Sequence, residues 1–269
     1  MKCGRPSSEP APSGLGLSLA GRRFGFAFDT ASFAAAMSRR YAAFLAPPPA
    51  GTVEVRAGGP VRPPFLPRVS GWPLISGRRG DFGFSFDAVS GSGRAVVSPR
   101  AQSFDSFLRT LCSALLNGSG GALVHACGLA VSGRAHVFIG RSGAGKSTLA
   151  RLAAAAGAEV ISDEIVPLRL ERGRFYVHGS PFWGELRSAG RPLRLPLGGI
   201  YALRKSRINS LRAGPVAGFI PLFMRCSLNF SKEPAASSGL LDAAARAARL
   251  YKGAFSFSKK NASFLRLLK

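Results

Sequence analysis

Acidic residues are scarce in this chain. Of its 269 residues, 13 are Asp or Glu and 37 are Lys or Arg, which gives a formal net charge of +24. The basic residues are scattered among Gly, Ala and Pro, so no basic tail is indicated. No nucleic-acid-reading motif accompanies them. We therefore expect no specific nucleic-acid role, although such a surface attracts anions such as nucleotides and acidic proteins.

Long apolar runs and clustered cysteines are also missing. No stretch approaches the about 18 apolar residues that cross a bilayer, and the opening residues 1–12 lack the apolar segment of a secretory signal. The chain has no CxxC pair and no histidine at metal-ligand spacing, which argues against a disulfide framework and a zinc site. We expect a cytoplasmic protein without membrane contact and with reduced thiols at Cys3, Cys112, Cys127 and Cys226.

Composition divides the chain into three parts. Residues 1–21 are rich in Ser, Pro and Gly, which predicts a disordered N-terminus. Residues 22–119 predict a small α+β region with mostly antiparallel strands, a helix over 32–45 and a second helix after Ser103. Residues 120–269 form the third part, where the patterns change to longer apolar runs.

The third part opens with a predicted hairpin. Two apolar runs, 122–131 and 135–140, flank a Ser132-Gly133 turn, as expected of paired strands. A helix over 147–156 and a strand over 159–162 should follow. We expect that strand to lie beside the second strand of the hairpin.

The segment after the hairpin carries a phosphate-binding motif. Residues 140–147, GRSGAGKS, fit the pattern GxxxxGK[ST] at every fixed position. Glycines let backbone N–H groups approach phosphate oxygens, and the N-terminus of the following helix adds partial positive charge. Lys146 would reach the β and γ phosphates and the Ser147 hydroxyl would bind Mg²⁺. The predicted nucleotide-binding residues are Gly140, Arg141, Ser142, Gly143, Ala144, Gly145, Lys146, Ser147 and Thr148.

An acidic pair follows the next predicted strand. Asp163 and Glu164 come directly after residues 159–162, at the end of the sheet where the loop should lie. Acids in a loop are usually solvated. In a chain with 13 acids, a pair at this position favours a role beside a metal-bound nucleotide.

Residues 124–168 resemble the catalytic domain of the HPr kinase/phosphorylase family and its shorter relatives. The resemblance rests on the spacing of His125, Lys146-Ser147 and Asp163-Glu164. That family shares a P-loop nucleoside triphosphate-binding fold with phosphoenolpyruvate carboxykinases. The resemblance therefore implies an α/β fold with a mixed sheet over 120–269.

The resemblance also implies residue roles. His125 would polarise phosphate, Ser147 and Asp163 would hold Mg²⁺, and Glu164 would be the base toward the acceptor hydroxyl. The family usually has a second Asp where this chain has Glu164. Its downstream motifs are not recognisable, so Glu185, as a further metal ligand, and Arg225 are positional candidates only.

The sequence thus predicts an ATP- and Mg²⁺-dependent kinase. We expect Lys146, Glu164 and His125 to transfer the γ-phosphoryl group to a hydroxyl, in the first place that of serine, on a protein, peptide or small molecule. The alternative is a non-catalytic nucleotide-binding switch with an acidic partner. The sequence identifies neither the acceptor nor which nucleotide, ATP or GTP, is bound. It is compatible with the presence or the absence of reverse phosphorylase activity and of homo-oligomerisation.

Several of these residues also have a purely structural interpretation. His125 fits a core histidine, Arg225 a surface arginine and Cys127 a small buried hydrophobic residue. Phe182 and Trp183 are expected to lie in the core or in the wall of a pocket.

Overall fold

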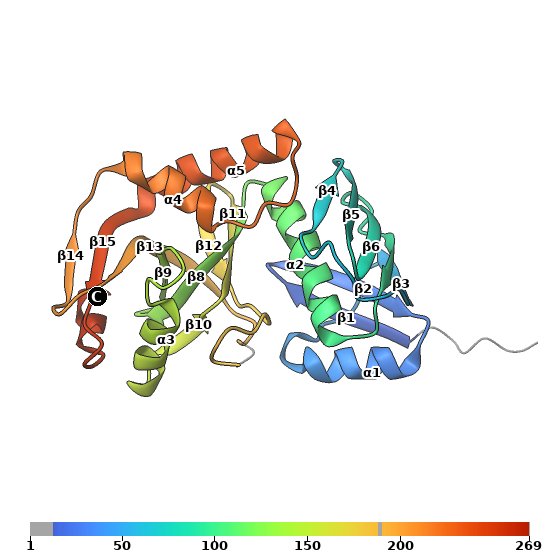
Figure 1. The fold of residues 1–269 in the computed structure, drawn as a ribbon, viewed down its shortest axis with the longest axis horizontal. Helices are drawn as coiled ribbons and strands as arrows, with labels where there is room; N and C mark the ends of the chain where they lie inside the picture. Colours follow the sequence, from blue (N-terminus) through green and yellow to red (C-terminus); the bar gives the residue numbers. More distant parts are fainter. Residues whose placement is uncertain (1–12, 188–189, 269) are drawn as a thin grey trace, which may run out of the picture.

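A computed structural model describes residues 13–187 and 190–268. It has an α/β architecture with two mixed β-sheets, one on either side of helix α2 (Ala101–Asn117) (Figure 1). The first sheet uses strands up to Val97 and the second begins at Ala122. None of the helices in the described residues is long and apolar enough to cross a membrane.

The first sheet has seven strands in the order β1-β2-β3-β7-β6-β5-β4. The β2/β3 and β3/β7 pairs are parallel, and the others are antiparallel. The elements are β1 (Ser13–Leu19), β2 (Arg22–Phe28), α1 (Ala31–Arg40), η1 (Ala42–Phe44), β3 (Thr52–Ala57), β4 (Arg68–Ser70), β5 (Leu74–Arg79), β6 (Phe82–Asp87) and β7 (Gly93–Val97).

The prediction of disorder over residues 1–21 is wrong from Ser13 onward, while residues 1–12 lie outside the described part. Leu15, Leu17 and Leu19 alternate along β1 and are buried, so period-2 burial outweighs the Gly and Ser content. A Cβ at Gly16 would collide with the carbonyl of Ala46. Glycine there allows the chain after η1 to cross β1 closely.

Phenylalanines form much of the first core. Alternate residues of β2 and β6 are Phe, and they face α2, where Phe104 and Phe107 meet them edge to face. The centroids of Phe26 and Phe104 are 5.4 Å apart. The helix predicted over 32–45 is shorter, since α1 ends at Arg40 and a 3-10 turn continues to Phe44.

The second sheet has the order β10-β8-β11-β12-β13-β15-β14, and β9 pairs with both β8 and β13. Its elements are β8 (Ala122–Val131), β9 (Arg134–Ile139), α3 (Lys146–Ala155), β10 (Glu159–Ser162), β11 (Ile165–Glu171), β12 (Arg174–His178), β13 (Arg194–Lys205), β14 (Ser210–Arg212), η2 (Val216–Gly218), α4 (Phe219–Cys226), α5 (Pro234–Ala247), η3 (Ala248–Leu250), β15 (Tyr251–Phe257) and η4 (Ser263–Leu268).

The predicted hairpin of β8 and β9 is confirmed. Val131 pairs with Arg134 across a two-residue turn, and Ser132 and Gly133 have φ of 50° and 71°. Two left-handed residues match the right-handed twist of the flanking strands.

The expected position of strand 159–162 is wrong. This strand, β10, pairs with β8 and not with β9, because β9 already lies between β8 and the parallel strand β13. Local apolar patterns reveal a strand, but they do not reveal which strand becomes its neighbour.

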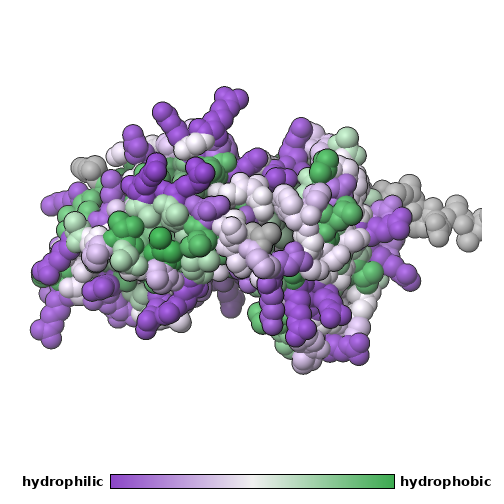
Figure 2. Space-filling view, turned by 90° about the horizontal axis from the view of Figure 1, so that it is seen from above, coloured by the Kyte–Doolittle hydropathy of each residue, from purple (hydrophilic) through white to green (hydrophobic). Residues whose placement is uncertain are grey.

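Hydrophilic side chains project around most of the face that Figure 2 shows, and hydrophobic residues form interrupted patches between them. Cys112, Cys127 and Cys226 are free and buried, which confirms Cys127 as a small buried residue. Cys3 lies outside the described residues.

Candidate functional site

The 140–145 loop joins the end of β9 to the first residue of α3, as the motif predicts. Gly143 and Gly145 have φ of 79° and 105°, a region that favours glycine. A Cβ at Gly145 would also lie 2.8 Å from the Phe257 ring, whereas one at Gly143 would meet nothing within 4 Å. Gly145 is therefore required by both backbone and packing, and the Gly143 side of the loop is open.

Lys146 is folded back over this loop. Its side chain is buried, and Nζ donates to the carbonyl oxygens of Gly140 at 2.9 Å and Arg141 at 3.4 Å. These carbonyls compensate the buried ammonium group. Both partners belong to the loop itself, so an anion held by the loop would lie within the reach of Lys146.

The remaining motif residues differ in exposure. Arg141 and Ser142 are exposed, and Ser147 and Thr148 are half-buried in the first turn of α3. Gly140 and Ala144 lie close together, because a Cβ on Gly140 would be 2.8 Å from the Ala144 Cβ.

Asp163 is buried at the end of β10. Its Oδ2 accepts a hydrogen bond from the Leu186 backbone N–H at 3.0 Å. A Cβ at Gly184 would collide with this carboxylate. The 181–186 segment therefore closes over Asp163, and glycine at position 184 permits the approach.

Strand register places His125 beside the 140–145 loop and the acidic pair. Ala126 pairs with Ile139, the last residue before the loop, and His125 pairs with Ile165 on the other side. The Ala126 N–H donates to the Glu164 carbonyl at 3.1 Å. His125 thus lies between the start of the loop and the acidic pair, and its Nε2 is 4.0 Å from Glu164 Oε2.

The His125 ring is close to several charges. Burial lowers its pKa below 6.5, Lys146 and Arg109 lower it further, and Glu164 and Asp163 oppose them. The lowered pKa favours the neutral imidazole, which weakens any ion pairing with Glu164. Its side chain is 47% exposed, so His125 is not a core histidine.

Arg109 is the site residue that sequence reasoning missed. It lies on α2, and its Nη1 is 3.4 Å from Glu164 Oε1, while Nη2 donates to the Trp183 carbonyl at 3.3 Å. Its guanidinium also lies over the Phe182 ring at 5.1 Å. The first sheet's helix thus contributes a cation to a site built mainly on the second sheet.

A second arginine supports the same segment from α1. Arg40 forms an ion pair with Asp105 at 2.9 Å, donates to the Pro181 carbonyl at 3.1 Å and lies 4.0 Å above the Trp183 ring. The Tyr41 hydroxyl donates to the same Asp105. Phe182 is buried, as predicted, and Trp183 is half-exposed beneath Arg40.

Two positional candidates are not brought into these contacts. Glu185 is exposed, and among the described residues it forms neither an ion pair nor a side-chain hydrogen bond. Arg225 is exposed in the last turn of α4. Its neighbour Cys226 contacts the loop instead, with Sγ 3.7 Å from the Gly140 carbonyl oxygen.

Metal-binding clusters were also sought among the side chains. Within 13–187 and 190–268, no three His, Cys, Asp or Glu residues gather as a metal site.

Comparison of the chain with protein-family models gave no match, and a search of curated proteins gave none either.

Proposed function

We propose that this protein is an ATP-dependent kinase that transfers the γ-phosphoryl group to a hydroxyl, in the manner of the HPr kinase family it resembles. The observation that carries the proposal is the convergence of four features. They are the glycine loop with Lys146, the buried Asp163, the half-exposed Glu164 and the neutral His125.

The order of secondary-structure elements in residues 120–269 supports the proposed kinase function. An antiparallel hairpin leads into the loop, and the loop opens a helix. The same order characterises the P-loop fold shared by HPr kinases and phosphoenolpyruvate carboxykinases, to which we assign this part of the chain.

ATP phosphates would bind over the 140–147 loop. Backbone N–H groups and the N-terminus of α3 supply a positive potential there. Lys146 would exchange its bonds to the Gly140 and Arg141 carbonyls for phosphate oxygens. This exchange costs little, because a carbonyl partner is replaced by a charged one.

The residues present fit a nucleotide-bound Mg²⁺. Mg²⁺ usually takes one or two protein oxygens and completes its shell with phosphates and waters, so three clustered acids are not needed. Ser147 and Asp163 would hold it, with Glu185 as a further candidate. When bound, Mg²⁺ neutralises charge on the phosphate oxygens.

Glu164 would act on the acceptor. As the acceptor oxygen bonds to the γ-phosphorus, the bond from that phosphorus to the β–γ bridging oxygen breaks, and the hydroxyl proton passes to the Glu164 carboxylate. Arg109 would orient that carboxylate through its 3.4 Å contact. His125, uncharged, can hydrogen-bond a phosphate oxygen.

The proposal is tested by Glu164→Gln, with Glu54→Gln as a control that removes an exposed acid of the first sheet. A base contributes on the order of 10² to 10⁴ in rate and little to ground-state binding. The variant should bind Mg-ATP as the wild type does and lose that factor in transfer of labelled phosphate to lysate proteins or free serine.

The opposite result would favour the nucleotide switch. If the wild-type protein binds Mg-ATP, labels nothing, and hydrolyses ATP at the same slow rate with or without Glu164, no acceptor base is at work. The kinase proposal then fails, and binding of an acidic partner becomes the activity to seek.

A further inference from the structure

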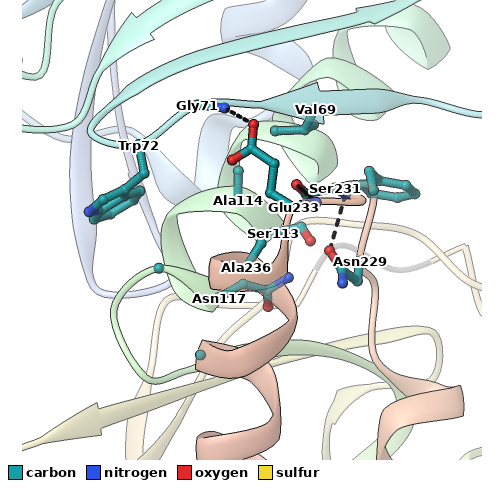
Figure 3. A pocket seen from close by; sticks show the side chains of 13 residues that line it. Val69, Gly71, Trp72, Ser113, Ala114, Asn117, Asn229, Ser231, Glu233 and Ala236 are labelled. Carbon is teal, nitrogen blue, oxygen red and sulfur yellow. Dashed lines mark hydrogen bonds between the residues drawn. The ribbon is translucent and has the colours of Figure 1, made fainter.

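A pocket of about 210 Å³ lies away from the 140–147 loop, between the two halves of the molecule (Figure 3). Three segments line it: the β4–β5 connection around Gly71, the last two turns of α2, and residues 229–239 leading into α5. The kinase proposal uses none of these residues. The volume is below the roughly 300–1,000 Å³ of pockets for drug-sized ligands, so a small molecule fits it.

One wall carries a carboxylate. Glu233 Oε1 accepts a hydrogen bond from the Gly71 N–H at 2.8 Å, which fixes the side chain, and Figure 3 shows its other oxygen on the pocket side. Within 13–187 and 190–268, no Lys, Arg or His forms an ion pair with Glu233. In a chain of net charge +24, an acid without a cationic partner at a pocket wall is notable.

The facing wall carries an aromatic ring. The Trp72 indole lies across the pocket from Glu233 (Figure 3) and against Gly118, where an added Cβ would collide with the ring. Gly118 has an ordinary helical φ of −74°, so glycine there is required by the indole and not by the backbone. The ring is therefore seated by the end of α2.

Two buried polar side chains, Ser113 and Asn117, form the floor. The Ser113 hydroxyl and the Asn117 Nδ2 both donate to the Leu228 carbonyl, at 2.6 and 3.1 Å. Asn117 Oδ1 is buried without a partner. The Glu233 carboxylate, with one oxygen outside the Gly71 hydrogen bond, suits a ligand that donates.

We propose that this pocket binds a small organic ammonium compound. A carboxylate supplies the counter-charge, and an aromatic face attracts a cation within about 6 Å of the ring. A neutral or anionic molecule of the same size would gain neither interaction. Because the site shares no residue with the loop, binding there is independent of whether the protein is a kinase.

The test uses choline and n-butylammonium chloride as probes, with 3,3-dimethylbutan-1-ol as the neutral isostere of choline. In Trp183→Phe protein, Trp72 is the single tryptophan of the chain, so its fluorescence reports on the pocket. We expect both cations to change this fluorescence saturably at constant ionic strength. The alcohol should bind at least about tenfold more weakly.

Two variants assign the binding to the pocket. Glu233→Gln should weaken choline binding about tenfold or more, whereas Asp242→Asn makes the same charge change at an exposed position of α5 and should leave it unchanged. Gly118→Ala should displace the indole and weaken binding, with thermal melting showing that the variant is folded.

Either of two results overturns the proposal. The first is that choline binds no better than its neutral isostere. The second is that folded Glu233→Gln and Asp242→Asn proteins bind choline equally well, which would mean that its binding is nonspecific.

Discussion

Arg109 connects the chemistry of the site to the first half of the chain. Its guanidinium contacts Glu164 and the Trp183 carbonyl, and its charge lowers the pKa of His125. An arginine beside a transferring phosphoryl group stabilises developing charge. Under the proposed function, Arg109 would serve this purpose and would also orient the Glu164 carboxylate through its 3.4 Å contact.

Removing this guanidinium should therefore reduce transfer. Arg109→Ala should lower the rate of the proposed phosphoryl transfer about 10²-fold, and Arg109→Lys should recover part of that rate. The control is Arg100→Ala, at an exposed position at the start of the same helix, which should leave the rate unchanged. NMR titration gives a second readout: the pKa of His125 should rise in Arg109→Ala, since a nearby positive charge is lost. An unchanged His125 pKa together with full activity would remove Arg109 from the site.

Residue-level reasoning could predict part of the candidate site, because the loop motif depends only on neighbouring residues in the sequence. The GxxxxGK[ST] spacing predicts Lys146 and Ser147 without any tertiary information. Arg109 lies 55 residues before Glu164 on a helix whose apolar face dominates its pattern. The only local signal was the Asp105/Arg109 pair at i, i+4, and it does not say what either residue contacts.

At the scale of elements, α2 holds the two sheets together. Its aromatic face completes the first core, and Ser113 and Asn117 bond to the Leu228 carbonyl in the second half. Phe104 is fully buried, with Phe26, Phe28 and Phe33 within 6 Å between ring centroids. Both the first core and the position of Arg109 depend on this packing.

Phe104→Ala should consequently destabilise the protein by about 3–5 kcal/mol, the usual cost of removing a buried phenyl ring. Phe65→Ala, at a side chain that is largely exposed, should cost about 0.5 kcal/mol or less. Urea unfolding followed by circular dichroism measures both. A loss below about 1 kcal/mol for Phe104→Ala would show that α2 is not packed as described.

Elements were predictable where their patterns are strong, and their neighbours were not. The hairpin, α3 and β10 follow from apolar runs and turn residues. Strand β1 was missed because glycine and serine mask its buried leucines. The neighbour of β10 depends on β13, which joins β9 from 60 residues further along the chain, beyond the reach of any local pattern.

At the scale of the whole molecule, all three histidines have a pKa below 6.5 in the folded protein. Burial is the main cause for His125, His136 and His178. His178 has this lowered pKa even though Nε2 contacts Glu171 Oε1 at 2.9 Å. Such a histidine takes up a proton more readily when the chain is unfolded, so the unfolded state gains protons first as the pH falls.

The free energy of unfolding should therefore decrease as the pH falls from 7.5 to 5.5. The stabilisation is fully present above pH 6.5 and is lost toward the lowered pKa values. The acids with lowered pKa values, such as Glu171 and Asp81, destabilise only at lower pH. Urea titrations at intermediate pH values measure the trend, and a stability that stays constant or rises over this interval would contradict the described burial of the histidines.

The most direct measurement for the proposed function is calorimetric titration of the intact protein with Mg-ATP. Lys146→Ala should weaken binding about tenfold or more, because a charge-assisted contact to phosphate is lost. Arg151→Ala removes a charge from an exposed position on the same helix and should bind as the wild type does. If the wild type fails to bind Mg-ATP, or if folded Lys146→Ala binds it equally tightly, the 140–147 loop does not hold a nucleotide.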